Sequence, residues 1–389
     1  MPACNAFGID RSSGSGSGSG MISLGGADPC MHGLLALLID PRQVGSVGLA
    51  DWDKIIRLAR QSRLLGVLSY RIQSHPELLP QVPGCVLGHL RSAAAYSAHR
   101  TQVLRVELAA LAKALPAEIP VVVLKGAAYI LQDLENARGR LPGDVDLMVA
   151  YNDLKQAEAA LLGAGWAAEE INDYDQRYYR EWSHELPPMR RPGSSVELDL
   201  HHTITPVTAR LKPDTTLLFA DLQAVEGKRF LVLHPQDQIL HAAVHLFQDS
   251  ELFANLRDLV DIDSLIRTHL NSESDWQALA VRAARHHLER PLWYALRYCR
   301  AWLATPVPDA LPLAAPPAAA IWWMDWVFPR CTLPRIPDRP PPFSRRVAAQ
   351  LGLLRHQWLR LPPALLLRHL AHKGLQSLRP RPAVQHKAE

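Results

Sequence analysis

Two aspartates separated by a single valine stand out in the segment DVDLMV, residues 144–149. Side chains two apart in a β-strand point to the same face, so Asp144 and Asp146 would present both carboxylates together while the apolar residues between them enter the core. Two like charges that close repel each other unless a cation lies between them, and Mg²⁺ prefers oxygen ligands of this kind. The spacing predicts a divalent metal site. The alternative is a pair of solvated acids at a strand end, after the turn-forming Gly143.

A second acidic strand is expected in the segment SVELDLHH, residues 195–202. Apolar residues alternate there with Glu197, Asp199 and His201, which would give one apolar face and one polar face. Three carboxylates on adjacent strands could hold two metal ions, and His201 could support a ligand. The alternative is that any half-exposed strand alternates in this way.

A glycine turn precedes these strands in the segment VVVLKGAA, residues 121–128. The β-branched run is typical of a buried strand, and the residues after it begin a helix. Free N–H groups and the positive dipole end of a helix bind phosphate, and Gly126 would let the backbone approach such a ligand closely. Lys125, Arg138 and Arg140 could add positive charge. Ordinary solvated charges beside a loop are the equally open alternative.

The hydrophobic pattern places helical regions on both sides of a mixed α/β unit. Within that unit we expect strands over 121–124, 144–149 and 195–201, helices over 127–137 and 154–162, and further strands over 166–171 and 229–233. The fold class is α+β, a mixed β-sheet core flanked by N-terminal and C-terminal helical regions. Five regions follow: 1–20 as a tag or fused peptide with a Gly-Ser linker, 21–115 as an N-terminal helical region, 116–235 as the core, 236–305 as a second helical region, and 306–389 as a proline-rich and basic helical region.

Together, the glycine turn, the DxD strand and the second acidic strand resemble the nucleotidyltransferase fold of the DNA polymerase β-like superfamily. More narrowly, LKGAA, the arginine four residues before DVDLMV and the later HPQDQILHAAVHLFQDSELFANLRDLVDIDSLI are similar to an uncharacterised nucleotidyltransferase family found in bacterial peptide natural-product and polysaccharide gene clusters. The resemblance covers roughly residues 110–270.

This resemblance implies that Gly126 and Ala127 receive the triphosphate and that Asp144, Asp146 and Asp199 bind two Mg²⁺ ions, with Asp199 also helping to deprotonate an acceptor hydroxyl. The implied reaction moves a nucleoside monophosphate from an NTP to that hydroxyl and releases pyrophosphate. Ala127 stands where the broader superfamily has glycine or serine, and the gap before Asp144 is longer than in compact members.

The acceptor is open at this level: a peptide, a small molecule such as a sugar or antibiotic, or an RNA end. The departures at Ala127 and in the gap favour a second reading, a catalytically weak module that binds a peptide or other partner on the same fold. A third is a toxin-type transferase that acts on transfer RNA. Residues 1–11, which precede the Gly-Ser linker, are either a tethered peptide ligand or a vector scar.

The composition of the chain limits the classes of protein to which it could belong. A formal net charge of +4 is too small to imply general nucleic-acid binding, although the region from Arg345 onward is basic. The five cysteines are scattered without metal-site or disulfide spacing, and no apolar run is long enough for a membrane span, so we expect a cytoplasmic protein.

A second DxD, Asp261 and Asp263, lies in a helical pattern where the two side chains cannot share a face. We expect these acids to be solvated or paired with Arg257 and Arg267.

Overall fold

The computed structural model describes residues 24, 29–249, 252, 255–336, 338 and 340–368. The linker and the peptide before it lie outside the described residues, as do residues 369–389 of the basic C-terminal region. No helix among the described residues combines the length and the apolar character that a membrane crossing requires.

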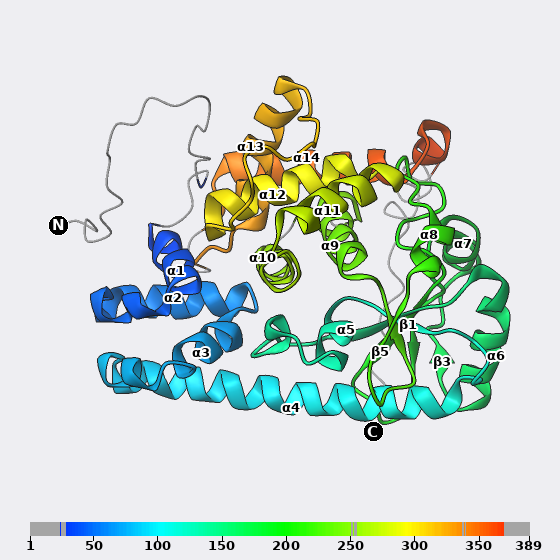
Figure 1. Cartoon of the computed structure of the whole chain (residues 1–389), viewed down its shortest axis with the longest axis horizontal. Helices are drawn as coiled ribbons and strands as arrows, with labels where there is room; N and C mark the ends of the chain where they lie inside the picture. The colour runs from blue at the N-terminus through cyan, green and yellow to red at the C-terminus, as the bar shows by residue number, and fades with distance from the viewer. Residues whose placement is uncertain are drawn as a thin grey trace, which may run out of the picture.

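The first region that the structure describes is helical, and its longest element is α4. Figure 1 shows α4 running beneath both the other N-terminal helices and the sheet. The leucines Leu104, Leu108 and Leu111 of α4 are buried, so this helix links the two parts of the core. The helices are α1 (Cys30–Ile39), α2 (Leu49–Gln61), α3 (Leu65–Gln73) and α4 (Gly84–Ala114), with 3-10 helices η1 (Pro41–Ser46) and η2 (Pro76–Gln81).

The middle of the chain forms a seven-stranded mixed sheet in the order β3-β4-β5-β2-β1-β7-β6. Its strands are β1 (Val122–Val123), β2 (Asp144–Met148), β3 (Ala167–Ala168), β4 (Met189–Arg190), β5 (Glu197–His201), β6 (Gln223–Ala224) and β7 (Leu231–Val232). Its helices are α5 (Lys125–Leu131), α6 (Leu154–Gly163), α7 (Asp173–Arg177) and α8 (Thr215–Ala220), with the short helical turns η3 (Glu135–Ala137), η4 (Tyr151–Asp153) and η5 (Tyr178–Trp182).

The chain then returns to helix above the sheet in the view of Figure 1. These elements are α9 (Pro235–Val244), η6 (His245–Asp249), α10 (Leu256–His269), α11 (Glu273–Arg285), α12 (Glu289–Leu303), α13 (Ala318–Thr332) and α14 (Phe343–Arg360). The α+β class predicted from the sequence is confirmed, with helical regions on both sides of the sheet. The expected strands and helices of the middle region are present, and the predicted helix over 127–137 is divided into α5 and η3.

The alternation predicted for β2 and β5 explains which face of the sheet is buried. Val145 and Leu147 of β2 are fully buried, and Leu198 and Leu200 of β5 are almost fully buried. These residues occupy one face, which packs in the core near α4. The acidic residues of both strands therefore lie on the opposite face.

Candidate active site

The strands β2 and β5 pair in parallel with a register that aligns their acidic residues. Asp144 is opposite Glu197, and Asp146 is opposite Asp199. Residues directly opposite in a parallel pair share a face, so all four carboxylates lie on the polar face of two neighbouring strands. Asp144 is exposed, whereas only 3% of Asp146 is exposed to solvent.

Asp146 is held by Lys125, the first residue of α5. The Lys125 ammonium donates to Asp146 Oδ1 at 2.9 Å, and the backbone N–H of Leu124 donates to the Asp146 carbonyl at 3.0 Å. Lys125 has φ +47°, a left-handed conformation that costs roughly 1–2 kcal/mol for a residue with a Cβ. Strain of this kind persists where the surrounding contacts fix the backbone, and it clusters at functional sites.

His201 completes the environment of Asp146. Its Nε2 lies 3.0 Å from the same Oδ1, and the His201 ring is 1% exposed. Burial opposes the charged form of Asp146, but the charge of Lys125 and the hydrogen bond from His201 outweigh it and hold the pKa of Asp146 well below its usual range. Burial likewise opposes the charged form of His201, while Asp146 and Glu185 prevail and raise its pKa.

Glu185 is a site residue that the sequence did not predict. Its Oε2 lies 3.6 Å from His201 Nε2, and its backbone forms an isolated antiparallel bridge with His201. Three residues lie between Glu185 and Met189, but only two lie between their partners His201 and Leu198. The extra residue is a β-bulge at the Pro187–Pro188 pair, and bulges re-aim side chains beside active sites.

Asp199 has the opposite electrostatic behaviour to Asp146. Burial, the neighbouring charge of Asp146 and the charge of Glu185 raise the pKa of Asp199 to about 8. The two aligned aspartates therefore differ strongly in their affinity for a proton, as expected for like charges on adjacent strands. This polar face holds more negative charge than Lys125 alone can balance.

Glu185 and His201 also belong to a group that includes His184. One possible ligand atom from each residue lies within 4.8 Å of the others. His241 of α9 reaches the site from the helical side. Burial, followed by the charge of Lys125, lowers its pKa well below the usual range, so this imidazole is neutral.

Gly126 and Ala127 are both buried at the start of α5, beneath Arg140. A Cβ on Gly126 would lie 2.0 Å from Arg140 Nη1, so the glycine makes room for this guanidinium. Arg140 is itself buried and pairs with Asp261 through Nε at 3.0 Å. The expectation that Asp261 is solvated or paired with Arg257 is therefore wrong, because it is buried as the partner of Arg140. The predicted pairing of Asp263 with Arg267 is confirmed at 2.8 Å.

The remaining residues predicted to form the site lie at its margins. Arg138 is exposed and pairs with Asp133 at 2.6 Å. Glu197 accepts a hydrogen bond from Arg190 Nε of β4 at 2.9 Å. The structure thus brings together Asp146, Asp199, Lys125 and His201 and places Arg138 in a separate ion pair.

The model of the uncharacterised nucleotidyltransferase family matches residues 49–304, from the start of α2 to the residue after α12. None of the curated proteins compared with the chain matches it. The match spans the N-terminal helices, the sheet with its acidic face and the helices that cover it. The chain therefore belongs to the uncharacterised nucleotidyltransferase family.

Proposed function

We propose that this nucleotidyltransferase moves a nucleoside monophosphate from an NTP to an acceptor hydroxyl and that Asp144, Asp146 and Asp199 hold Mg²⁺. The observation that carries the proposal is the parallel register that aligns Asp146 with Asp199 on one face, directly beside the Lys125 ammonium. A lone pair of acids at a strand end would have neither the second acidic strand nor a half-buried cationic partner with a left-handed backbone.

The residues present fit a hard divalent cation. An ammonium group already lies against Asp146, which indicates that the carboxylate favours a positive charge at that position. The donors are carboxylate oxygens, as Mg²⁺ prefers. Bound Mg²⁺ would supply charge neutralisation at the phosphates and increase the acidity of the acceptor hydroxyl.

The chain's own residues account for binding and proton transfer. Lys125 can exchange its bond with Asp146 for a bond to a phosphate oxygen, which would leave His201 as the neighbour of Oδ1. The acceptor oxygen forms a bond to the α-phosphorus, and the bond from that phosphorus to the bridging oxygen breaks, so pyrophosphate leaves with the electron pair. Asp199 in its ionised form is placed to accept the acceptor's proton. His201 orients Asp146 through its 3.0 Å contact.

In this proposal Arg140 and Gly126 do not contact the triphosphate, in contrast to the expectation from the sequence. Arg140 neutralises Asp261 within the protein, and Gly126 admits its guanidinium. Lys125 and backbone groups near it would then contact the triphosphate directly. Arg138 stays outside the proposed contacts.

Ligand-dependent stability tests the proposal. We expect Mg²⁺ with one of the four NTPs to raise the free energy of unfolding by about 2.7 kcal/mol at a concentration 100 times Kd. Asp146→Asn should abolish that response, whereas Asp309→Asn, at a side chain 98% exposed, should keep it. Intact mass after incubation with candidate acceptors should then show the gain of one nucleoside monophosphate.

A second candidate is a module that binds a partner on this fold with little turnover. The observation that favours it is that Asp146 Oδ1 already contacts both Lys125 and His201, so a metal ion must displace a bonded group. The wild-type protein would then show no stabilisation with Mg²⁺ and any NTP. That result would overturn the transferase proposal.

A further inference from the structure

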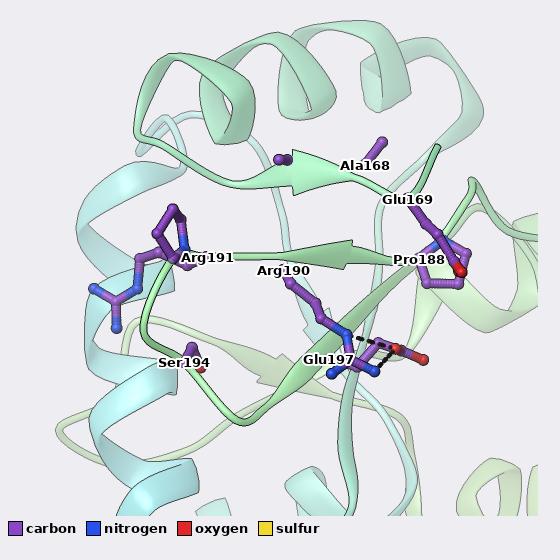
Figure 2. Close-up of a pocket in the computed structure, with 9 residues that line it drawn as sticks. Ala168, Glu169, Pro188, Arg190, Arg191, Ser194 and Glu197 are labelled. Carbon is purple, nitrogen blue, oxygen red and sulfur yellow. Dashed lines mark hydrogen bonds and ion pairs between the residues drawn. The ribbon is translucent and has the colours of Figure 1, made fainter. Parts of the chain in front are cut away.

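A cavity of about 530 Å³ lies on the sheet over β3, β4 and the start of β5. Figure 2 shows the ion pair of Arg190 with Glu197 at its centre and Glu169 beside Pro188 at one side. Ser194 lies in the loop at the opposite side. A cavity of this volume suits a small molecule or a few residues of a larger one.

The pairing register places this cavity on the same face as the proposed metal ligands. Ala167 pairs with Arg190, Arg190 with Glu197, and Glu197 with Asp144, so these four residues form one row across four strands. Directly paired residues share a face of the sheet. The row therefore leads from the cavity to Asp144 without crossing to the other face.

A second row runs parallel to the first. The bulge leaves Pro187 and Pro188 opposite a single residue of β5, Asp199, which pairs with Asp146. The backbone N–H of Glu169 donates to the Pro188 carbonyl at 2.8 Å, which extends the row to β3. The cavity thus adjoins Asp144 through Glu197 of its lining, and Pro188 of its lining lies one residue pair away from Asp146.

The geometry of the reaction indicates which substrate would bind on the β4 side of the acidic strands. In an in-line displacement the attacking oxygen and the leaving pyrophosphate lie on opposite sides of the phosphorus. Lys125 follows β1, on one side of the acidic strands, and the cavity lies over β4 and β3, on the other side. Resting on the proposed function, we propose that this cavity binds the acceptor and not the nucleotide.

The charges of the lining give the chemical class of that acceptor. The two arginines of the lining are both paired, Arg190 with Glu197 and Arg191 with Glu107 of α4. No ion pair involves the exposed Glu169 among the residues the structure describes. The unbalanced charge at this side is therefore negative, and it would repel a triphosphate. A small acceptor rich in hydroxyl groups and carrying a cationic amine suits these carboxylates.

Filling the cavity provides the test. Ala167 is exposed in the row of the cavity floor, so Ala167→Trp should occupy the space without disturbing the core. Ala159→Trp, on the exposed side of α6 and outside the lining, is the matched control. Binding is measured on the full chain with two kinds of probe: Mg²⁺ with α,β-methylene-ATP, and the sugar pair D-glucosamine and D-glucuronate.

We expect Ala167→Trp to weaken glucosamine binding at least about tenfold and to leave the Kd of the nucleotide analogue within about twofold of wild type. Glu169→Gln should weaken glucosamine binding about tenfold through loss of a charge-assisted hydrogen bond, and glucuronate should bind more weakly than glucosamine to the wild-type protein.

Three results would overturn the acceptor assignment while leaving the transferase proposal intact. One is loss of analogue binding in Ala167→Trp but not in Ala159→Trp, which would make the cavity the nucleotide site. Another is glucosamine binding that both tryptophan variants retain. The third is wild-type protein that binds the analogue but binds glucosamine no better than glucuronate. Failure of the wild-type protein to bind the analogue would instead refute the transferase proposal.

Discussion

Substituting Gly126 by alanine should destabilise the protein through Arg140. The new Cβ would lie 2.0 Å from Arg140 Nη1 and 2.6 Å from Cζ, so the guanidinium must move away from Asp261. Breaking one buried ion pair costs about 3–5 kcal/mol, and alanine returns about 0.5–1 kcal/mol of helix propensity. We therefore expect the free energy of unfolding in urea to fall by about 2–4 kcal/mol.

Two further variants isolate the cause. Gly88→Ala changes an exposed glycine of α4 with no neighbouring atom near the added Cβ, so it should raise stability by about 0.5–1 kcal/mol. In a protein already carrying Arg140→Met and Asp261→Leu, the pair is absent and Gly126→Ala should change stability by less than about 1 kcal/mol.

The same experiment separates the two roles considered for Gly126. If the glycine serves only the close approach of a phosphate, Gly126→Ala will leave unfolding unchanged and weaken nucleotide binding alone. A wild-type free energy of unfolding in Gly126→Ala would refute the argument from Arg140. So would an equal loss of stability in the background that lacks the ion pair.

Two more charge contacts give measurable outcomes. Lys125→Met should lower the free energy of unfolding by about 1–3 kcal/mol at pH 7, since it leaves Asp146 with one fewer partner, and Mg²⁺ should restore part of that loss in thermal melts. Burial disfavours the charged form of Asp237, but His286 and Arg282 outweigh burial and lower the pKa of this carboxyl. The ionised Asp237 therefore stabilises the fold fully above the pKa of an unfolded aspartate, near 3.9. That stabilisation is lost as the pH falls below this value. Asp237→Asn should therefore cost about 1–3 kcal/mol at pH 7, because it leaves the half-exposed Asp221 as the ionic partner of Arg282, and should flatten the acid limb of the stability profile between about pH 5 and 3. An acid limb as steep as that of wild type would contradict this account.

The two acidic strands were accessible from sequence because their pattern is local. The alternation of Asp144 and Asp146 with buried residues has the period of a strand, and Glu197, Asp199 and His201 repeat it. The period also indicates which side chains share a face. It does not determine register, so the alignment of Asp146 with Asp199 required the structure.

The contacts missed by sequence reasoning are non-local or depend on a bulge. Arg140 and Asp261 are 121 residues apart, and nothing in the helical pattern around Asp261 distinguishes a solvated acid from a buried one that has an arginine partner. Glu185 faces the site because one extra residue interrupts its strand pairing. The available signal was the pair Pro187–Pro188, since proline in a strand marks an edge or a bulge.

The helical region after the sheet helps to set the position of Lys125. Lys125 begins α5 in a left-handed conformation, which persists only if the residues after it are fixed. The next residue, Gly126, packs on Arg140, and Arg140 is held by Asp261 of α10. A substitution on α10 can therefore move the Lys125 ammonium away from Asp146 without altering any of the proposed metal-binding residues. The family match from 49 to 304 agrees with this dependence, because it includes α10 together with the sheet.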